Sequence, residues 1–249
     1  MLKNQRHNEI MQILRKKGFV TVAELSRDLY ASPSSIRRDL AQLEKQGFVK
    51  RSYGGAEAIS SAAHILPFSA RSIDNVDQKY IIAQKAVAFV HENDVVFLDQ
   101  SSTSYFLALM LRDMKNITVV TNNIEILNLL SKSNMTVHCS GGTISRDNDT
   151  CLVGNNAQAT FEGIYADVMF FSTKSVSADG VISDCSQDEI FVRNAMFKNA
   201  GKKVFLCDSK KVGTHASFVQ CSLSDIDAVV SETDCFDSFR RQFPTLEIM

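Results

Sequence analysis

The chain has 249 residues, of which 45% are hydrophobic and 22% charged, a balance that is typical of folded proteins and excludes a largely disordered chain. This length accommodates one large domain or two of ordinary size. The apolar runs, such as residues 95–98, are too short for a membrane helix, and the first residues lack the apolar core of a signal peptide. These features predict a soluble, cytoplasmic protein.

The formal net charge of −1 hides an asymmetry between the two ends of the chain. Residues 1–57 contain eleven Lys and Arg against six Asp and Glu, so this segment is basic and the remainder is acidic. A basic segment joined to a larger acidic body predicts a nucleic-acid contact in the first segment.

The six cysteines all lie outside the basic segment, and their spacing contains no C-x-x-C pair and no paired histidines. Free cysteines usually behave as small buried hydrophobic residues, so the pattern predicts neither a zinc site nor a disulfide framework. We expect no metal and no cofactor. The residues are Cys139, Cys151, Cys185, Cys207, Cys221 and Cys235.

The basic segment begins with two predicted helices. Residues 5–17 carry apolar side chains at helical spacing and end before Gly18, a common helix stop. Thr21 and Glu24 then match a capping box, in which the Thr hydroxyl accepts a hydrogen bond from an early helix N–H group and the Glu side chain reaches back. The helix that this box opens is predicted to run to about Leu29.

A third helix is predicted over residues 33–46, because a serine N-cap and a proline at the first helical position precede an apolar stripe at Ile36, Leu40 and Leu43. Two short helices joined by a tight turn form a helix-turn-helix, whose second helix enters the major groove of DNA. With the stripe buried, Arg38 faces outward, where its guanidinium can reach guanine edges.

Residues 48–55 change from apolar to basic to glycine, as a β-wing lying on the phosphate backbone requires. Solvated surface charge is the ordinary explanation for any single basic pair in this segment. The pairs occur together with capped helices and a net positive charge, so the segment is predicted to bind double-stranded DNA. The candidate DNA contacts are Ser32, Ser34, Ser35, Arg37, Arg38, Lys45, Lys50, Arg51 and Tyr53.

The same residues carry a resemblance to a known family. The run Ser32-Pro33-Ser34-Ser35-Ile36-Arg37-Arg38-Asp39-Leu40, the spacing Leu43-Glu44-x-x-Gly47 and the ending Arg51-x-Tyr53-Gly54-Gly55-Ala56 resemble the N-terminal signature of the DeoR family of bacterial transcriptional regulators. Ala31 and Ser35 depart mildly from the family's usual Val and Thr. The resemblance implies a winged helix-turn-helix over residues 1–57 that binds a DNA operator.

Residues 58–75 are predicted to be a linker, and residues 76–249 a second domain. In this domain short apolar runs alternate with helical stripes, which predicts an α/β fold with a mainly parallel sheet covered by helices on both faces. The predicted strands are residues 95–98, 117–120, 136–139, 168–171, 204–206 and 228–230. The predicted helices are residues 79–90, 105–111, 124–130 and 190–200.

Small polar residues follow five of these strands, at the edge where such sheets bind ligands. Residues 101–104 open directly into a helix, so their hydroxyls and the helix N–H groups suit an anion, and carboxylate and amide side chains suit neutral hydroxyls. One such loop alone is usually an N-cap, but five together predict a site for a phosphorylated sugar. The candidate effector residues are Asp99, Ser101, Ser102, Thr103, Thr121, Asn122, Asn123, Gly141, Gly142, Lys174, Asp208 and Lys210.

The resemblance to the DeoR family continues through this domain. It implies an effector domain similar to the ribose-5-phosphate isomerase and CoA-transferase fold, which senses phosphorylated sugars or related metabolites. Ser101 stands where the family usually has glycine, so the identity of the effector cannot be carried over. The adjacent Lys210 and Lys211 leave open which lysine faces the ligand. The matching landmarks are Asp99, Thr103, Thr121, Asn122, Gly141, Gly142, Gly154, Asp167, Gly180, Glu189, Asp208 and Ser209.

The leading hypothesis is a transcriptional regulator of carbohydrate metabolism genes, usually a repressor in this family, whose operator affinity depends on a phosphorylated sugar. We expect a homo-oligomer, a dimer or a tetramer, because one small DNA-binding domain binds weakly and paired domains read paired half-sites.

Two other functions compete with this hypothesis. A sugar-phosphate isomerase with an appended DNA-binding domain would use Asp179, Asp184 or Glu189 as its base. The glycine-rich loop with lysine that resembles the catalytic segment of isomerases is not found, so we expect no enzyme activity. A first domain that serves only protein–protein contact would bind without the steep salt dependence of DNA binding.

Overall fold

The computed structural model of this chain describes residues 3–45, 48–58 and 65–249. The chain divides into two compact units, Met1–Arg71 and Ser72–Met249. Helix α4 (Phe68–Ile73) occupies part of the range predicted as a linker, and residues 59–64 of that range lie outside the described residues. The linker boundaries remain a prediction. Among the described helices, none is long and apolar enough to cross a membrane.

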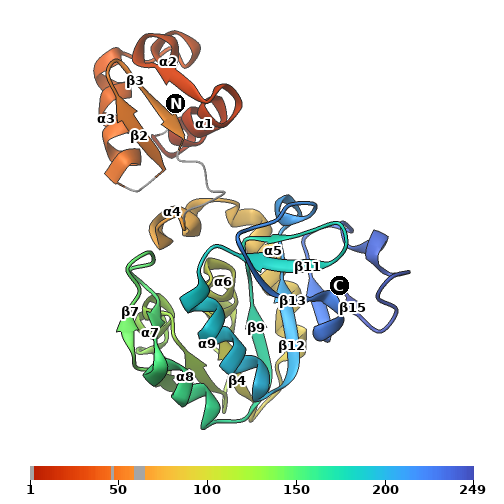
Figure 1. Ribbon diagram of the computed structural model, residues 1–249. Coiled ribbons are helices and arrows are strands. Elements are labelled where there is room, and N and C mark those ends of the chain that lie inside the picture. Colours follow the sequence, from red (N-terminus) through yellow and green to blue (C-terminus); the bar gives the residue numbers. More distant parts are fainter. Residues whose placement is uncertain (1–2, 46–47, 59–64) are drawn as a thin grey trace. The chain divides into compact units, whose positions relative to one another are not determined.

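The described part of the first unit combines helices α1 to α3 with an antiparallel sheet of order β1-β3-β2 (Figure 1). Its elements are α1 (Lys3–Lys17), β1 (Phe19–Thr21), α2 (Val22–Asp28), α3 (Pro33–Lys45), β2 (Val49–Ser52) and β3 (Gly55–Ala58). The three predicted helices and the wing, which is the β2–β3 hairpin, are confirmed. The expected end of the third helix at Gln46 and Gly47 lies outside the described residues.

Local sequence explains these boundaries. Gly18 follows α1 with a φ of +77°, a conformation that glycine adopts without strain. The predicted capping box is confirmed: the Thr21 hydroxyl accepts from the Glu24 N–H at 3.2 Å, and the Glu24 carboxylate accepts from the Thr21 N–H at 2.8 Å. The predicted stripe of α3 is buried, with Ile36 fully inaccessible and Leu40 only 1% exposed.

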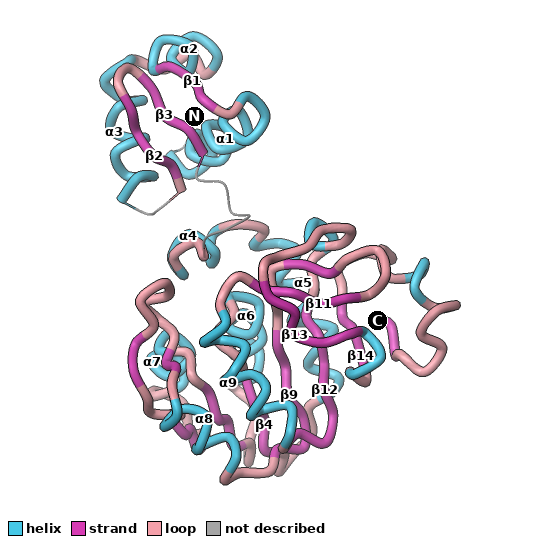
Figure 2. The backbone as a smooth tube through the Cα atoms, viewed as in Figure 1, coloured by secondary structure: helices cyan, strands magenta, loops and turns pink. Residues whose placement is uncertain are grey.

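The second unit is built on a sheet of order β15-β14-β12-β9-β4-β5-β6, in which every neighbouring pair is parallel. Figure 2 shows β14, β12, β9 and β4 of this sheet in that order. The predicted parallel α/β fold is therefore confirmed. The helices of this unit are α5 (Val76–Ala86), α6 (Ser102–Leu111), α7 (Ile124–Leu130), α8 (Asn155–Glu162) and α9 (Gln187–Lys198). The strands of the main sheet are β4 (Val95–Leu98), β5 (Thr118–Thr121), β6 (Thr136–Cys139), β9 (Ala166–Phe171), β12 (Ala200–Leu206), β14 (Ala228–Val230) and β15 (Glu247–Ile248).

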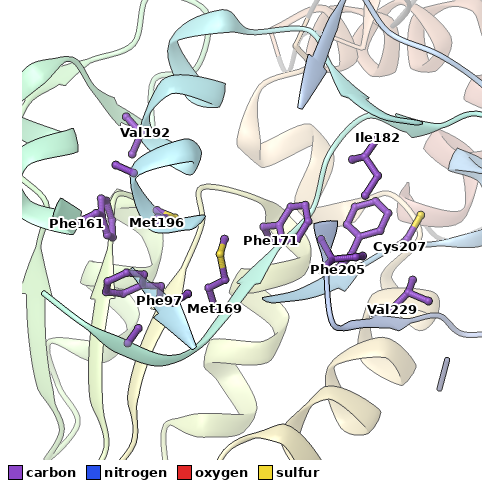
Figure 3. Packing of buried hydrophobic residues seen from close by; sticks show 14 of the residues in the cluster. Phe97, Phe161, Met169, Phe171, Ile182, Val192, Met196, Phe205, Cys207 and Val229 are labelled. Carbon is purple, nitrogen blue, oxygen red and sulfur yellow. The ribbon is translucent and has the colours of Figure 1, made fainter. Parts of the chain in front are cut away.

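Helices cover both faces of this sheet, as the alternation of strands and helices predicts. One apolar cluster packs α8 and α9 on one face, where the Phe161 and Phe97 rings meet edge to face with centroids 5.1 Å apart (Figure 3). The other cluster packs α5, α6 and α7 against the opposite face, through buried side chains such as Ile82 and Leu107. Because both faces are covered, the strands are nearly continuous apolar runs, which made them recognisable in the sequence.

The sequence analysis missed several elements. A second, antiparallel sheet has the order β10-β11-β13, and β7 pairs with β8 as a two-stranded ribbon. These strands have only two to five residues each, too few for a hydropathy pattern to mark them. The predicted helix at residues 190–200 is wrong at both ends, because α9 begins at Gln187 and Ala200 already starts β12. The missed strands are β7 (Thr143–Ile144), β8 (Leu152–Val153), β10 (Ser175–Val176), β11 (Val181–Asp184), β13 (Phe218–Ser222) and β15 (Glu247–Ile248), and the missed helix is α8 (Asn155–Glu162).

Candidate functional site

The outward face of α3 carries most of the predicted DNA contacts. Arg37 and Arg38 are both exposed. The Ser32 hydroxyl caps the helix by accepting from the Ser35 N–H at 3.3 Å, and it lies 3.0 Å from the Ser34 hydroxyl. Two guanidinium groups and a cluster of hydroxyls therefore occupy the first turns of one exposed helix, where they can hydrogen-bond with base edges and phosphates.

Asp39 anchors this helix, a role that the sequence analysis missed. Its carboxylate is 2% exposed and lies 2.5 Å from Arg6 Nε and 3.2 Å from His7 Nε2, both on α1. Burial alone raises the pKa of Asp39, but the hydrogen bond and charge of Arg6, with a smaller part from His7, outweigh burial and lower it. The spacing of three residues from Ile36, which places Asp39 beside the buried stripe, was the available signal.

The wing presents a different set of groups from the set expected. Lys50 and Tyr53 are exposed, as a backbone contact requires. Arg51 is instead paired with Glu44 at the end of α3: its Nε donates to the carboxylate at 2.6 Å and its backbone N–H donates at 3.0 Å. Arg51 therefore ties the wing to the recognition helix. The side chain of Lys45 lies outside the described residues.

The strand order of the second unit identifies where a ligand belongs. From β4 the chain continues outward through β5 and β6, whereas from β9 it continues the other way through β12, β14 and β15. The edge of the sheet beyond the carboxyl ends of β4 and β9 is therefore the topological switch point, which is the usual ligand position in open parallel sheets. Asp99 follows β4 and Ser172 follows β9, and the Ser172 N–H donates to Asp99 at 3.0 Å.

A buried arginine contacts Asp99 at this switch point. Arg193 of α9 is fully inaccessible and donates to Asp99 at 3.4 Å, to Asp184 at 3.0 Å and to Gln220 at 2.7 Å. Burial opposes the charge of Arg193, but the carboxylates of Asp184 and Asp99 outweigh it and hold its pKa above the ordinary value. Sequence reasoning missed Arg193, because an arginine inside a helix is normally exposed.

Asp99 itself differs from the expected contact to a ligand hydroxyl. Besides Arg193 and Ser172, it accepts from the Ser101 N–H at 3.1 Å and the Ser104 hydroxyl at 2.6 Å, and it is fully buried. Each of its two oxygens already accepts two hydrogen bonds from the protein. Asp99 therefore shapes the loop that opens α6 and presents no free oxygen to a ligand.

The first turn of α6 contains the serine and threonine residues predicted as an anion site. Ser101 is the N-cap, and its hydroxyl accepts from the Ser104 N–H at 3.0 Å. Ser102 and Thr103 follow in the first turn, and both are buried, with 5% and 1% of each residue exposed. A helix N-terminus with uncommitted hydroxyls and N–H groups attracts phosphate.

Two amide side chains after β5 are each held at one end only. Asn122 donates to the Leu152 carbonyl at 3.0 Å, and Asn123 caps α7 by accepting from the Glu125 N–H at 2.8 Å. The Asn122 Oδ1 and the Asn123 Nδ2 are buried without a partner among the described residues. Thr121, the third predicted residue here, is used within the protein, since its hydroxyl accepts from the Asn123 N–H at 3.1 Å.

The structure distinguishes the adjacent Lys210 and Lys211, of which Lys211 lies at the switch point. The Lys210 amine donates to Asn75, whereas the Lys211 amine donates to the Ser172 hydroxyl at 2.8 Å and lies 3.5 Å from Asp208. Lys210, the lysine expected among the effector residues, therefore points to Asn75, and Lys211 is the lysine that lies beside Ser172 at the switch point. The remaining oxygen of Asp208 is buried with no partner in the described chain.

Lys174 and the two glycines complete the predicted set. Burial lowers the pKa of the Lys174 amine; the nearby Cys185 opposes that shift and Lys211 adds to it. Gly142 has a φ of +102°, and a Cβ there would lie 2.5 Å from the Val153 carbonyl oxygen. Gly141, with a φ of +64°, has open space beside it. Packing thus accounts for Gly142. At Gly141, the backbone N–H donates to the Cys139 Sγ at 3.5 Å and the carbonyl accepts from the Ser140 hydroxyl at 3.0 Å.

The carboxylates considered as catalytic bases are all engaged by neighbouring groups. Asp184 pairs with Arg193 at 3.0 Å, and Glu189 accepts from the side chains of Gln100 at 2.7 Å and Asn148 at 2.8 Å. Asp179 is on the surface in the turn before β11, where it accepts from the Ser177 hydroxyl.

Two family models match this chain, one over each unit. The family model described as DeoR-like helix-turn-helix domain matches residues 6–62, and the one described as DeoR C terminal sensor domain matches residues 74–233. A solved structure of D-ribose-5-phosphate isomerase in complex with phospho-erythronic acid overlaps 55% of this chain and 54% of its own, at 14% identity and a TM-score of 0.42.

Curated relatives match over almost the full chain. The uncharacterized HTH-type transcriptional regulator YgbI of Escherichia coli K12 is 31% identical, covering 97% of this chain and 94% of the relative. The HTH-type transcriptional regulator GolR of Listeria innocua is 30% identical, covering 98% and 96%. The two family models together with these relatives establish a helix-turn-helix DNA-binding domain joined to a small-molecule sensor domain. The chain belongs to the DeoR family of helix-turn-helix transcriptional regulators.

Proposed function

We propose that this chain is a repressor of carbohydrate metabolism genes whose operator affinity is modulated by a phosphorylated sugar. The observation that carries the proposal is a parallel-sheet switch point bordered by serine and threonine hydroxyls, Lys211 and two amide atoms without a partner, Asn122 Oδ1 and Asn123 Nδ2, in a chain that also has an exposed basic recognition helix. Two relatives, each 28% identical, support it by name: the glycerol-3-phosphate regulon repressor of Escherichia coli K12 and the lactose phosphotransferase system repressor of Staphylococcus epidermidis.

On the DNA side, Arg38 reads base edges in the major groove, because a guanidinium can donate two hydrogen bonds to guanine. Arg37 and the serines of the first turn of α3 contact bases or phosphates. Lys50 and Tyr53 of the wing contact the backbone and set the affinity for DNA of any sequence. Arg51 acts indirectly, by holding the wing against Glu44.

On the effector side, the phosphate lies at the first turn of α6, bound by Ser102 and Thr103. Lys211 supplies positive charge, because its contact with Ser172 brings the amine beside the Asp99 loop. Lys174 adds a second, desolvated amine, which gains most from an anionic partner. The sugar hydroxyls face the unpaired amide groups of Asn122 and Asn123.

The effector controls DNA binding only if it binds the DNA-competent and DNA-incompetent arrangements of the protein with different affinity. A difference of about 1–3 kcal/mol changes operator affinity about 5- to 150-fold. A homo-oligomer, a dimer or a tetramer, reads repeated or palindromic half-sites and amplifies this change.

The test is a salt-controlled titration of the full chain against the promoter region beside its gene, repeated with a panel of sugar phosphates. The proposal requires tight DNA binding that weakens steeply as the ionic strength rises. It also requires that one sugar phosphate of the panel lowers the affinity for DNA. Binding that ignores salt would favour a protein–protein role for the first domain. Absence of specific binding under every condition would refute the regulator proposal.

No enzymatic role forms part of this proposal, and the protein is assigned to the cytoplasm with its DNA. An isomerase needs a carboxylate free to take a proton from a sugar carbon, whereas Asp184 and Glu189 are each held by protein donors. Turnover of ribose 5-phosphate above that of a Glu189→Ala control would overturn this assignment.

A further inference from the structure

Gln100, which the candidate effector residues did not include, lies in the loop between β4 and α6 at the switch point. It follows Asp99 directly and precedes Ser101, the N-cap of α6. Its side chain is almost completely buried, with 2% of the residue exposed. A buried glutamine in a ligand-binding loop must find partners for both ends of its amide, or leave one end for the ligand.

The orientation of the Gln100 amide is determined by Glu189. The Gln100 Nε2 donates to one carboxylate oxygen of Glu189 at 2.7 Å, and the Asn148 Nδ2 donates to the other at 2.8 Å. A carboxylate only accepts hydrogen bonds, so the amide nitrogen of Gln100 must face it. The carbonyl oxygen Oε1 therefore points away from Glu189 and cannot exchange places with the nitrogen.

Oε1 of Gln100 has no hydrogen-bond partner in the part of the chain described, although it is sealed from solvent. A buried acceptor without a donor is costly, and Asn122 Oδ1 after the neighbouring strand is in the same condition. Two oriented acceptors at one end of the sheet call for a ligand that donates hydrogen bonds. Because both are sealed, the ligand reaches them only when the side chains that cover them move.

We propose that Gln100 is a specificity-determining residue of the effector site, whose carbonyl oxygen accepts a hydrogen bond from one hydroxyl group of the bound sugar phosphate. The inference rests on the proposed sensing of a phosphorylated sugar and adds the chemical feature that is selected. Glu189 and Asn148 are positioning residues, since they act on the ligand only by orienting Gln100.

The Gln100 carbonyl oxygen distinguishes a sugar phosphate that carries this hydroxyl from a deoxy analogue that lacks it. Removing the hydroxyl leaves Oε1 unpaired in the complex, so the deoxy analogue binds about 5- to 150-fold more weakly, the range for one buried hydrogen bond of about 1–3 kcal/mol. The same loss is not expected when a different hydroxyl is removed.

The experiment measures binding of pentose and hexose phosphates to the full chain by isothermal titration calorimetry, each compound paired with its monodeoxy analogues. Ribose 5-phosphate with 2-deoxyribose 5-phosphate and glucose 6-phosphate with 2-deoxyglucose 6-phosphate are the first pairs. Wild type is compared with Gln100→Met, which removes the amide, and with Gln100→Lys, which keeps a donor for Glu189 and lacks an acceptor. Gln84→Met, at an exposed position of α5, is the matched control.

The expected result is that wild type and Gln84→Met prefer the hydroxyl compound of one pair by at least fivefold, and that both Gln100 variants bind the two members of that pair equally. Preferences at the other hydroxyls stay unchanged in all four proteins. A Gln100 variant that folds and keeps every preference overturns the inference alone. If no sugar phosphate binds wild type, the proposed function fails and this inference fails with it. If wild type binds but discriminates at no hydroxyl, only the inference fails.

Discussion

Replacing Arg193 by methionine tests whether the buried ion cluster holds the switch point together. Arg193 donates to Asp99, Asp184, Gln220 and the Ser172 carbonyl, and its side chain is fully inaccessible. Methionine fills much of the same volume but donates no hydrogen bond, so the carboxylates lose their only described cationic partner in direct contact.

The size of the stability loss depends on the hydrogen bonds that each carboxylate retains after the substitution. Asp99 retains three donors, from Ser101, Ser104 and Ser172. Asp184 retains only the Cys185 N–H among the contacts described and is 7% exposed. Leaving one charge of a buried pair unpaired costs about 3–5 kcal/mol, and we expect a loss of about 3 kcal/mol, because the solvent exposure of Asp184 relieves part of it.

Urea denaturation of the full chain, followed by circular dichroism at pH 7, measures this loss. Arg112→Met is the control, since Arg112 is half-exposed, lies 3.7 Å from an exposed Asp113, and is expected to change stability by less than about 0.5 kcal/mol. Arg193→Lys should recover only part of the loss, because one ammonium group cannot reach partners that a guanidinium fork joins. An Arg193→Met protein as stable as Arg112→Met would refute the structural role assigned to the cluster.

Three further predictions concern single positions. Arg38→Ala should lose about 1–3 kcal/mol of preference at one base pair, whereas Lys50→Ala should weaken binding to all DNA about equally. Fluorescence anisotropy with operator and scrambled duplexes distinguishes these two effects. Unchanged affinity and preference in Arg38→Ala would refute the recognition-helix assignment. Asp39→Asn should destabilise the first unit by about 1–3 kcal/mol at pH 7. Because the folded-state pKa of Asp39 is lowered, its contribution is present above the unfolded pKa of about 3.9 and is lost as the pH falls through the folded value, so a stability difference that persists undiminished at pH 2 would contradict it. Gly142→Ala should cost about 1–3 kcal/mol and more than Gly141→Ala, because only Gly142 faces a carbonyl oxygen at 2.5 Å; equal melting temperatures would refute this.

Much of the DNA-binding domain could be predicted from the sequence, because its signals are local. The capping box of Thr21 and Glu24 and the stripe that begins at Ile36 depend on residues three or four positions apart, and both are present in the structure. The pairing of Arg51 with Glu44 was not predictable in the same way. Both residues look like solvated charges in the sequence, and only the hairpin geometry brings them within hydrogen-bond distance.

In the second unit, the sequence identified the edge of the sheet. It did not reveal which residues at that edge hydrogen-bond within the protein and which have groups left for a ligand. Asp99 was expected to bind a hydroxyl, yet the folded chain surrounds it with protein donors that include Arg193, 94 residues away. Gln100 appeared featureless in the sequence and became informative only through its contact with Glu189, 89 residues away.

The sequence by itself determined the helices of the DNA-binding domain, most strands of the parallel sheet and the basic recognition helix, because periodicity, capping and charge act over a few neighbouring residues. Only the tertiary structure decided which polar groups satisfy one another and which remain unpaired, since hydrogen bonds at the switch point join loops from distant parts of the chain. Lys210 and Lys211 are adjacent in sequence and chemically identical, and the turn after β12 alone directs one to Asn75 and the other to Ser172.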